Sequence, residues 1–226
     1  MNHYFVTGTD TDVGKTQVAA ALLHLAAKRG LTTSAVKPIA AGCAREKQGL
    51  RNSDALALMA ECHPELEYDA VNPVALAPAI APHIAAQQAG LSLQVADLLP
   101  KVQRVLAQGA AISVVEGAGG WRVPLNDNET LADLAQQLQL PVVLVVGMRL
   151  GCISHALLTA EAIERDGLAF AGWVANVIDP HSACIAANIE CLKERLPAPC
   201  LGSVPFLADP TPAAVAEYLV LPEDVG

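Results

Sequence analysis

The 226-residue sequence is poor in aromatic and charged side chains and has no long apolar run. Only 4% of its residues are aromatic and 16% are charged. The longest predominantly apolar run, residues 140–148, is far shorter than the ~20 residues that a membrane-spanning helix needs. The first residues also lack the basic and apolar stretches of a secretory signal. We therefore expect no membrane partner and no targeting segment.

The cysteines and histidines form no recognisable framework. None of the six cysteines belongs to a C-x-x-C pair, and the six histidines are scattered without an H-E-x-x-H pattern. A G-x-S-x-G motif is absent as well, which leaves a Ser-His-Asp site without support. We expect a cytoplasmic protein whose cysteines are reduced and act as small buried apolar residues.

The charge is acidic overall but unevenly distributed. The formal net charge is −9, which argues against a nucleic-acid backbone as the main partner. Residues 1–51 nevertheless hold seven basic and three acidic side chains. Solvated helix faces would explain this basic segment as well as a binding site would. The apolar fraction of 53% argues against disorder.

Short apolar runs rich in β-branched residues recur along the chain. Several of them are apolar nearly throughout, which is typical of parallel strands buried on both faces. The expected strands are residues 4–7, 33–37, 112–116, 142–147, 172–177 and 201–204.

Helical stretches alternate with these strands. This alternation predicts an α/β fold with a mostly parallel sheet and helices on both faces. Residues 64–91 hold four prolines and no clean period, so we expect an irregular excursion there. We expect one domain, residues 1–226. The expected helices are residues 13–28, 53–60, 92–107, 130–138, 154–165 and 182–195.

The starts of these helices carry capping residues. Ser53, Ser154 and Ser182 begin three of them, and serine is a common N-cap. The Thr130-x-x-Asp133 pattern is close to a capping box. Pro100 is expected to kink or interrupt its helix.

The first strand is followed by a glycine-bounded loop that ends in Gly-Lys-Thr. In residues 8–16, GTDTDVGKT, five residues separate the glycines, whereas the common phosphate loop has four. In a strand–loop–helix context, backbone N–H groups and the helix N-terminus face an anion. Lys15 would then reach the β- and γ-phosphates, and the Thr16 hydroxyl would ligate Mg²⁺. A simple turn is the alternative.

Three further strand ends carry polar side chains. Ligands bind outside the carboxyl ends of such strands, where Lys37, Glu116 and Asn176 stand. Glu116, with Asp54 as a second carboxylate, would hold Mg²⁺ beside the phosphate loop. Taken singly, Lys37, Asp54 and Asn176 are more typical of a surface lysine, a helix-start residue and a turn. For Glu116, a capping role in a tight turn is the alternative. Together with the loop they predict a Mg²⁺-dependent nucleotide enzyme.

Taken in order, the motifs of this chain resemble those of the dethiobiotin synthetase family. The resemblance extends along nearly the whole chain. Its long-gap loop is shared with related ATP-dependent amidotransferases and partitioning ATPases, whereas residues 51–54 and 116–121 are more specific. The matching segments are GTDTDVGKT (8–16), KP (37–38) with Gly42, RNSDA (51–55), EGAGGW (116–121), LGCI (150–153) and GWVAN (172–176).

The resemblance implies closure of a cyclic urea on 7,8-diaminononanoate, with CO₂ and ATP, through a carbamate and a carbamic–phosphoric anhydride. By similarity, Thr16, Asp54 and Glu116 would hold Mg²⁺. Lys15 and Lys37 would stabilise the carbamate and the transferring phosphoryl group, with Thr11 as a further catalytic residue. The implied nucleotide-binding residues are Asp12, Val13, Gly14, Lys15, Thr16, Gln17, Asp54, Glu116, Gly117, Ala118, Gly119, Asn176, Val177, Pro205, Phe206 and Leu207.

The family works as a homodimer, which implies a diamine site at the subunit interface. A helix N-terminus there would receive the carboxylate of the diamine. The family often has Asn at Ser154 and a hydroxyl residue near Ala41, whose methyl group cannot donate a hydrogen bond. The implied substrate-binding residues are Lys37, Ala41, Gly151, Cys152, Ile153 and Ser154.

Two other functions compete with the ring-closing ligase. One is an ATPase switch of the partitioning type, in which hydrolysis drives partner binding. The other is a small-molecule binding module without chemistry, which would have to explain lysines and carboxylates gathered around a phosphate loop. The segments 51–54 and 116–121 favour the ligase.

Overall fold

The structure, a computed structural model, describes residues 1–225 and has a parallel sheet at its centre. Its strands are β1 (Asn2–Gly8), β2 (Thr33–Val36), β5 (Ile112–Glu116), β6 (Val142–Gly147), β7 (Phe170–Asn176) and β8 (Cys200–Val204). They lie in the order β2-β5-β1-β6-β7-β8, and every neighbouring pair is parallel. The predicted α/β fold is confirmed, and each expected strand is present within two residues of its predicted bounds.

The central strands are buried on both faces. All residues of β5 and β6 are buried, as expected for apolar parallel strands covered by helices on each side. The register places Val6 beside Glu116 and Gly147 beside Asn176. Because all the strands point the same way, the polar residues at their carboxyl ends meet at one edge of the sheet.

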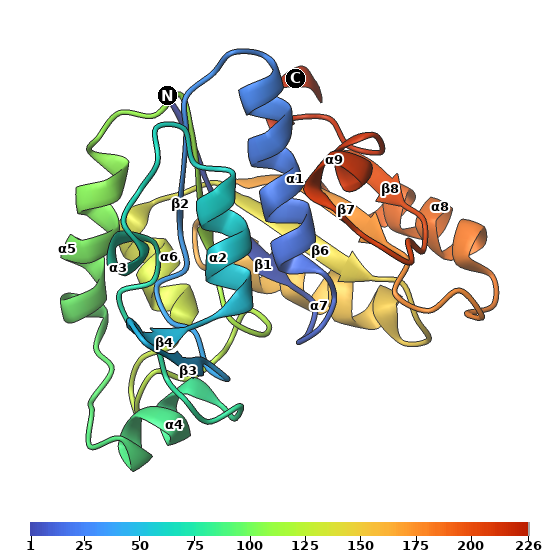
Figure 1. The fold of residues 1–226 in the computed structure, drawn as a ribbon. Helices are drawn as coiled ribbons and strands as arrows, with labels where there is room; N and C mark the ends of the chain where they lie inside the picture. Colours follow the sequence, from blue (N-terminus) through green and yellow to red (C-terminus); the bar gives the residue numbers. More distant parts are fainter. Residues whose placement is uncertain (226) are drawn as a thin grey trace.

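Helices cover both faces of the sheet (Figure 1). One face carries α1 (Lys15–Lys28), with α2 (Ser53–Ala60) and α9 (Pro212–Ala216) on either side of it. The opposite face carries α5 (Val95–Leu106), α6 (Leu131–Leu138), α7 (Cys152–Arg165) and α8 (Ile185–Arg195).

Several helix starts differ from the predicted ones. Asn52, not Ser53, caps α2, because its side-chain oxygen accepts from the N–H groups of Asp54 and Ala55. Helices α7 and α8 follow Gly151 and Cys184, so Ser154 lies inside the first turn of α7. Glycine and αL residues replace the expected side-chain caps at these two positions.

Two further predictions from the sequence, for Pro100 and for the capping box, differ in outcome. Helix α5 continues through Pro100, so the expected interruption is wrong. The Thr130–Asp133 capping box is present: the Asp133 carboxylate accepts from the N–H and the hydroxyl of Thr130.

The crossover between β2 and β5 contains structure that the sequence did not indicate. A small antiparallel hairpin, β3 (Ala44–Glu46) with β4 (Gly49–Arg51), precedes α2. Two short helices, α3 (Tyr68–Val71) and α4 (Pro82–Gln88), interrupt the predicted irregular excursion. A final 3-10 turn, η1 (Pro222–Val225), packs near the amino terminus, where Glu223 accepts from the Tyr4 hydroxyl.

The cysteines follow the prediction only in part. Cys43, Cys62 and Cys152 are buried and free, as expected. Cys184 is exposed and Cys191 and Cys200 are half-buried, although Cys200 still packs against the core cluster between β6, β7, α7 and α8. Across residues 1–225 we find no helix that is both long and apolar enough to cross a membrane.

Candidate active site

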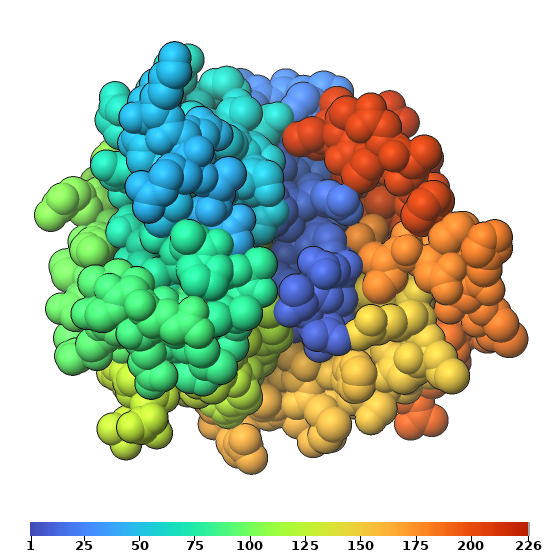
Figure 2. All heavy atoms as spheres, turned by 60° about the horizontal axis from the view of Figure 1, so that its bottom comes forward, coloured from blue at the N-terminus to red at the C-terminus, as the bar shows by residue number. Residues whose placement is uncertain are grey.

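The phosphate loop lies at the carboxyl edge of the sheet. Figure 2 views this edge and shows the loop (dark blue) at the surface, between the cyan and green crossover and the yellow and orange segments. Asp12 and Gly14 both have left-handed backbone, with φ of 58° and 85°. A Cβ atom at Gly14 would lie 2.1 Å from Nδ2 of Asn176. The second glycine is therefore required both by its backbone conformation and by close packing.

Asn176, at the end of β7, holds the phosphate loop in place. Its side chain is 4% exposed, and its Nδ2 donates to the carbonyl of Val13 at 2.9 Å. The sequence placed Asn176 beside an adenine edge without indicating this contact. The amide donor is engaged with the loop, so Asn176 also has a role in shaping it.

Lys15 bends back over its own loop. Its Nζ donates to the carbonyl of Asp10 at 2.8 Å, and burial lowers the pKa of Lys15. The Asp10 carboxylate pairs with Arg149, which follows β6. The hydrogen bond from the Thr11 N–H lowers the pKa of Asp10, and Arg149 lowers it further to a smaller extent. The loop is thus tied to the segment that leads into α7.

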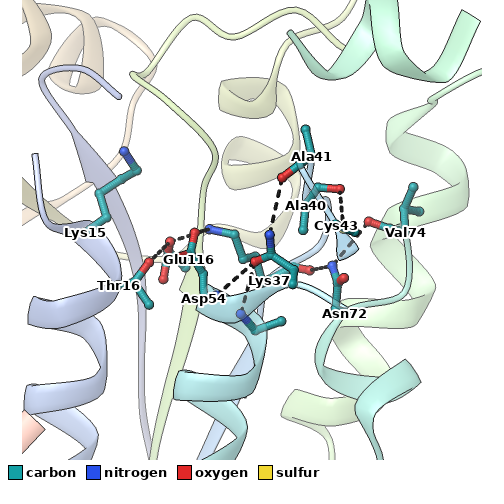
Figure 3. Close-up of polar contacts among 12 residues, drawn as sticks. Lys15, Thr16, Lys37, Ala40, Ala41, Cys43, Asp54, Asn72, Val74 and Glu116 are labelled. Atoms are coloured by element: carbon teal, nitrogen blue, oxygen red, sulfur yellow. Dashed lines mark hydrogen bonds and ion pairs between the residues drawn. The ribbon is translucent and has the colours of Figure 1, made fainter. Parts of the chain in front are cut away.

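Four predicted residues from separate segments meet beside the loop. Figure 3 shows the Lys37 ammonium between the carboxylates of Asp54 and Glu116. Lys37 Nζ lies 2.5 Å from Oε1 of Glu116 and 3.0 Å from Oδ2 of Asp54. The same Glu116 oxygen accepts from the Thr16 hydroxyl at 2.8 Å. The structure therefore brings together the three expected metal ligands and the expected catalytic lysine.

The electrostatics of this cluster favour a charged Lys37. Burial alone would lower the pKa of this lysine, which is 4% exposed. The attraction of Glu116 and then Asp54 outweighs burial, so the pKa of Lys37 is raised above its ordinary value. Lys37 is protonated at neutral pH and supplies a positive charge at the strand ends.

The cluster also fits a divalent cation. Glu116 is fully buried, and among the described residues its Oε2 has no hydrogen-bond partner. A buried carboxylate oxygen without a partner is costly, and a cation ligand would satisfy it. Within the described chain no group of three His, Cys, Asp or Glu residues gathers, and the oxygen groups that this site offers to a cation are the Asp54 and Glu116 carboxylates and the Thr16 hydroxyl. Such a small set suits Mg²⁺, which keeps waters and binds substrate phosphates.

The glycine-rich segment after Glu116 packs tightly against the loop. The Gly117 N–H donates to the carbonyl of Val6 at 2.9 Å. A Cβ atom at Gly120 would lie 3.6 Å from the Gly8 carbonyl oxygen, and one at Gly119 3.5 Å from the Thr11 hydroxyl. The segment 117–120 thus shares the edge with Thr11 and the rest of the loop.

The predicted diamine-carboxylate site lies at the N-terminus of α7. Gly151 has left-handed backbone with φ of 94°, and Cys152 is buried beneath it. Ile153 and Ser154 follow within the first turn. Neither Ser154 nor an equivalent Asn at this position would cap the helix, because the chain enters the helix two residues earlier.

The predicted adenine segment follows β8. Val177 and Pro205 are adjacent there, since the Val177 N–H donates to the Val204 carbonyl at 2.9 Å. Phe206 is 49% exposed and Leu207 is half-buried. The Phe206 ring and the end of β8 therefore lie on the same side of the phosphate loop as Asn176.

Sequence reasoning missed the polar residues that support Lys37 and Asp54. Asn72 donates from Nδ2 to the Lys37 carbonyl at 2.8 Å, and Asn52 donates to the Ala41 carbonyl at 3.3 Å. The Tyr68 hydroxyl contacts both of these asparagines. The only signal was the position of Asn52 within the RNSDA segment. Tyr68 and Asn72 lie in the stretch that was interpreted as irregular.

Comparisons with known proteins agree with this geometry. A family model described as an AAA domain matches residues 2–214. A Pseudomonas aeruginosa protein (strain UCBPP-PA14) is 61% identical over 221 residues, covering 98% of this chain and 97% of its own. A Cellvibrio japonicus protein is 59% identical over 218 residues, covering 96% and 95%. Both are named ATP-dependent dethiobiotin synthetase BioD.

Two solved structures of low sequence identity are similar to this chain in fold. The signal recognition particle receptor FtsY from Elizabethkingia anophelis superposes with a TM-score of 0.54 at 16% identity. The match covers 96% of this chain, which spans 64% of the receptor chain. The 54 kDa signal recognition particle protein from Aeropyrum pernix, solved with GDP, gives a TM-score of 0.53 at 16% identity, over 96% of this chain and 44% of that one.

Proposed function

Because the chain belongs to the ATP-dependent dethiobiotin synthetase family, we propose that its strand-end site performs the chemistry of that family. The enzyme uses ATP and CO₂ to close 7,8-diaminononanoate into dethiobiotin. One amine attacks CO₂ and, after losing a proton, forms a carbamate. A carbamate oxygen then attacks the γ-phosphorus and ADP leaves. The second amine attacks the carbamate carbon, the carbon–oxygen bond breaks, and phosphate departs with that oxygen.

We propose that the phosphate loop binds the triphosphate. Helix α1 begins at Lys15, directly after the loop. The N–H groups of loop residues 12–14 and of the first turn of α1 would bind the β- and γ-phosphates. Lys15 exchanges the Asp10 carbonyl for a phosphate oxygen. The burial that lowers the pKa of Lys15 also makes this desolvated ammonium a strong partner for an anion. Thr11, which lies on the part of the loop next to Gly119, contacts the reacting groups.

We propose that Lys37 stabilises the carbamate and the transferring phosphoryl group. The reaction needs positive charge and positioning rather than a covalent protein partner. Thr16, Asp54 and Glu116 would hold Mg²⁺, which supplies charge neutralisation on the phosphates when bound. The Glu116 Oε2, which has no hydrogen-bond partner within residues 1–225, supports this assignment. Positive charge around the attacking amine lowers the pKa of that amine and so favours the neutral nucleophile.

We propose that the remaining predicted residues frame the two ends of the substrates. Asn176, Val177 and residues 205–207 surround the adenine, and segment 117–119 contacts the nucleotide. The N-terminus of α7, residues 151–154, receives the diamine carboxylate. The backbone at Ala41, held by Asn52, faces the diamine in place of the hydroxyl residue common in the family.

We further propose that residues 1–226 form one synthetase domain that works as a cytoplasmic homodimer. Leu150, which lies just before α7, and Leu158 on α7 are 98% and 60% exposed. This apolar surface beside the proposed diamine-carboxylate site supports contact with a second copy. The buried free thiols of Cys43, Cys62 and Cys152 are typical of a reducing compartment.

A single observation carries this proposal: Lys37, Asp54, Glu116 and Thr16 converge beside the phosphate loop. The test is phosphate release from ATP with Mg²⁺ and bicarbonate, measured with and without the diamine. We expect release to depend on the diamine and to match dethiobiotin formation mole for mole. Slow release that ignores the diamine would instead indicate an ATPase switch.

A further inference from the structure

A single buried hydroxyl connects the two segments that present Asp54 and Lys37. The Tyr68 hydroxyl accepts from the Asn52 backbone N–H at 2.8 Å and donates to Oδ1 of Asn72 at 3.0 Å. Tyr68 is 7% exposed, and Asn52 and Asn72 are equally inaccessible. The hydroxyl therefore uses its donor and an acceptor on protein partners in a largely buried region.

One branch of this network leads to Asp54. Asn52 caps α2, since its Oδ1 accepts from the Asp54 N–H at 3.1 Å and the Ala55 N–H at 3.3 Å. Its Nδ2 donates to the Ala41 carbonyl. The backbone of Asn52 is in turn held by Tyr68. The first turn of α2, from which the Asp54 carboxylate extends, is thus fixed by bonds that begin at the Tyr68 hydroxyl.

The other branch leads to Lys37, as Figure 3 shows around Asn72. Asn72 Nδ2 donates to the carbonyls of Lys37 at 2.8 Å and Val74 at 3.2 Å. The Lys37 N–H donates to the Val71 carbonyl at 2.7 Å. The main chain on both sides of the Lys37 side chain is therefore tied to α3, the helix that carries Tyr68.

Arg51 completes the arrangement from outside. Its guanidinium carbon lies 4.1 Å from the centre of the Tyr68 ring, within the range of a cation–π contact. Arg51 directly precedes Asn52, so the residue that covers the ring and the residue that binds the hydroxyl are neighbours in the chain. The orientation of the ring is set by the same segment that its hydroxyl holds.

We propose that Tyr68 is a positioning residue for phosphoryl transfer, holding the Asp54-bearing helix and the Lys37 backbone in register through Asn52 and Asn72. This inference rests on the proposed function of Lys37 and Asp54. Tyr68 itself does not touch the reacting atoms. It acts because the ammonium and the carboxylate are productive only at a fixed separation.

The chain offers a matched control for removing this hydroxyl. Tyr4 is 8% exposed, belongs to the same core cluster as Tyr68, and donates one hydrogen bond to Glu223 at 3.0 Å. Tyr4 lies on β1, and its hydroxyl points to the C-terminal turn. Tyr4→Phe and Tyr68→Phe therefore remove the same atom from comparably buried rings, and only the second touches the network.

Tyr68→Phe should lower kcat for diamine-dependent phosphate release by about 10- to 100-fold, as losses among ligand-supporting residues do. The KM for ATP should change by no more than about threefold, because the phosphate loop is untouched. Tyr4→Phe should keep kcat within about twofold of the parent. A kcat for folded Tyr68→Phe that matches Tyr4→Phe would overturn the proposal.

Two further measurements separate positioning from general support. Asn72→Ser should also lower kcat. The kcat of the Tyr68→Phe/Asn72→Ser double variant should lie within about twofold of that of the less active single variant, because both residues act in one series of hydrogen bonds. If the fold-losses in kcat of the two single variants multiply in the double variant, the two residues act independently and the shared series of hydrogen bonds is contradicted. Asn72→Ser also tests the network if Tyr68→Phe does not fold.

Mn²⁺ binding to the nucleotide-free protein, followed by electron paramagnetic resonance, gives a readout without turnover. Tyr68→Phe should weaken Mn²⁺ binding by about 10-fold relative to Tyr4→Phe, since Asp54 is displaced. Equal Mn²⁺ affinity in the two variants would contradict the inference. If the parent enzyme shows no diamine-dependent release, the proposed function fails, while the Mn²⁺ comparison still decides the role of Tyr68.

Discussion

The two sides of the proposed active site are built in different ways. The phosphate loop, residues 8–16, is one contiguous segment whose shape depends on Gly14 and on left-handed backbone at Asp12, with outside contacts from Asn176 and Arg149. The crossover side presents Lys37 and Asp54 from segments held by Tyr68 and Asn72. The first side is a local motif, and the second is an assembly of distant polar contacts.

The two sides therefore differ in which substitutions disturb them. A loop shaped by local backbone conformation is sensitive to the residues inside it. An assembled side depends on hydrogen bonds between elements, so changes far along the chain can displace its charged groups. We therefore expect substitutions on the two sides to affect ATP binding and turnover differently.

The largest expected effect is on the crossover side. Lys37→Ala removes the buried ammonium between Asp54 and Glu116, and turnover should fall by about 10²- to 10³-fold or more, as when a transition-state donor is lost. The control is Lys193→Ala, which removes an exposed lysine that pairs with Glu190 on α8. Steady-state phosphate release checks this prediction. Near-normal turnover in Lys37→Ala would show that its catalytic assignment is wrong.

The matching change on the loop side should show a different kinetic pattern. Lys15→Ala removes the ammonium that lies over the loop, so we expect turnover to fall by orders of magnitude and the KM for ATP to rise about 10-fold or more. Lys37→Ala should leave ATP affinity closer to normal. ATP titrations followed by calorimetry check the contrast, and equal ATP affinity in the two variants would remove the distinction between the sides.

A stability comparison tests the packing of the loop. Gly14 and Gly30 both have positive φ, 85° and 76°, but within the described chain a Cβ atom at Gly30 meets nothing within 4 Å. Gly30→Ala should cost only the backbone strain, about 1–2 kcal/mol. Gly14→Ala should cost about 1–3 kcal/mol more, because it also displaces the buried, bonded Asn176 amide.

The same comparison has an internal check. In an Asn176→Ala background, the extra cost of Gly14→Ala over Gly30→Ala should disappear, because the clashing amide is gone. Chemical denaturation of the four variants measures this. An unchanged excess would mean that Asn176 does not restrict the loop.

The smallest expected effect concerns the segment after Glu116. Asp166, with a side chain 8% exposed, accepts from the Trp121 indole at 2.7 Å and from Arg122 at 2.6 Å. Burial alone would raise the pKa of Asp166, but these donors lower it. A carboxyl with a lowered pKa stabilises the fold above its ordinary pKa and loses that contribution as pH falls through the lowered value.

Asp166→Asn should therefore reduce the free energy of unfolding by about 1–2 kcal/mol at pH 7. The difference from the parent should shrink as the pH falls below 3.8, the ordinary pKa of this carboxyl. Urea denaturation over a pH series checks the trend. A gap that stays constant down to pH 3 would exclude Asp166 as its source.

The contrast between the sides also explains what could be predicted from the sequence. The strands at residues 112–116 and 142–147 have the predicted bounds, because continuous β-branched runs suit buried parallel strands. The loop and the meeting of Lys37, Asp54 and Glu116 follow from parallel strands ending at one edge. These predictions needed only local pattern and chain direction.

The rest of the site could not be predicted, because it depends on contacts between distant residues. Tyr68 and Asn72 lie among prolines that hide any helical period, although α3 forms there and binds the Lys37 backbone. Asn52, not Ser53, is the cap because α2 already begins at Ser53, and the Asn52 side chain also reaches the distant Ala41 carbonyl. The Asp10–Arg149 pair joins residues 139 positions apart. No local pattern encodes such pairs.

The most direct test of the central claim follows one oxygen atom. The protein is supplied with ATP, Mg²⁺, the diamine and CO₂ labelled with oxygen-18, in unlabelled water, and the released phosphate is analysed by mass spectrometry at early times. If a carbamate oxygen attacks the γ-phosphorus at this site, each phosphate carries one oxygen from CO₂. Phosphate that takes its new oxygen only from water would show ATP hydrolysis instead and would contradict the account.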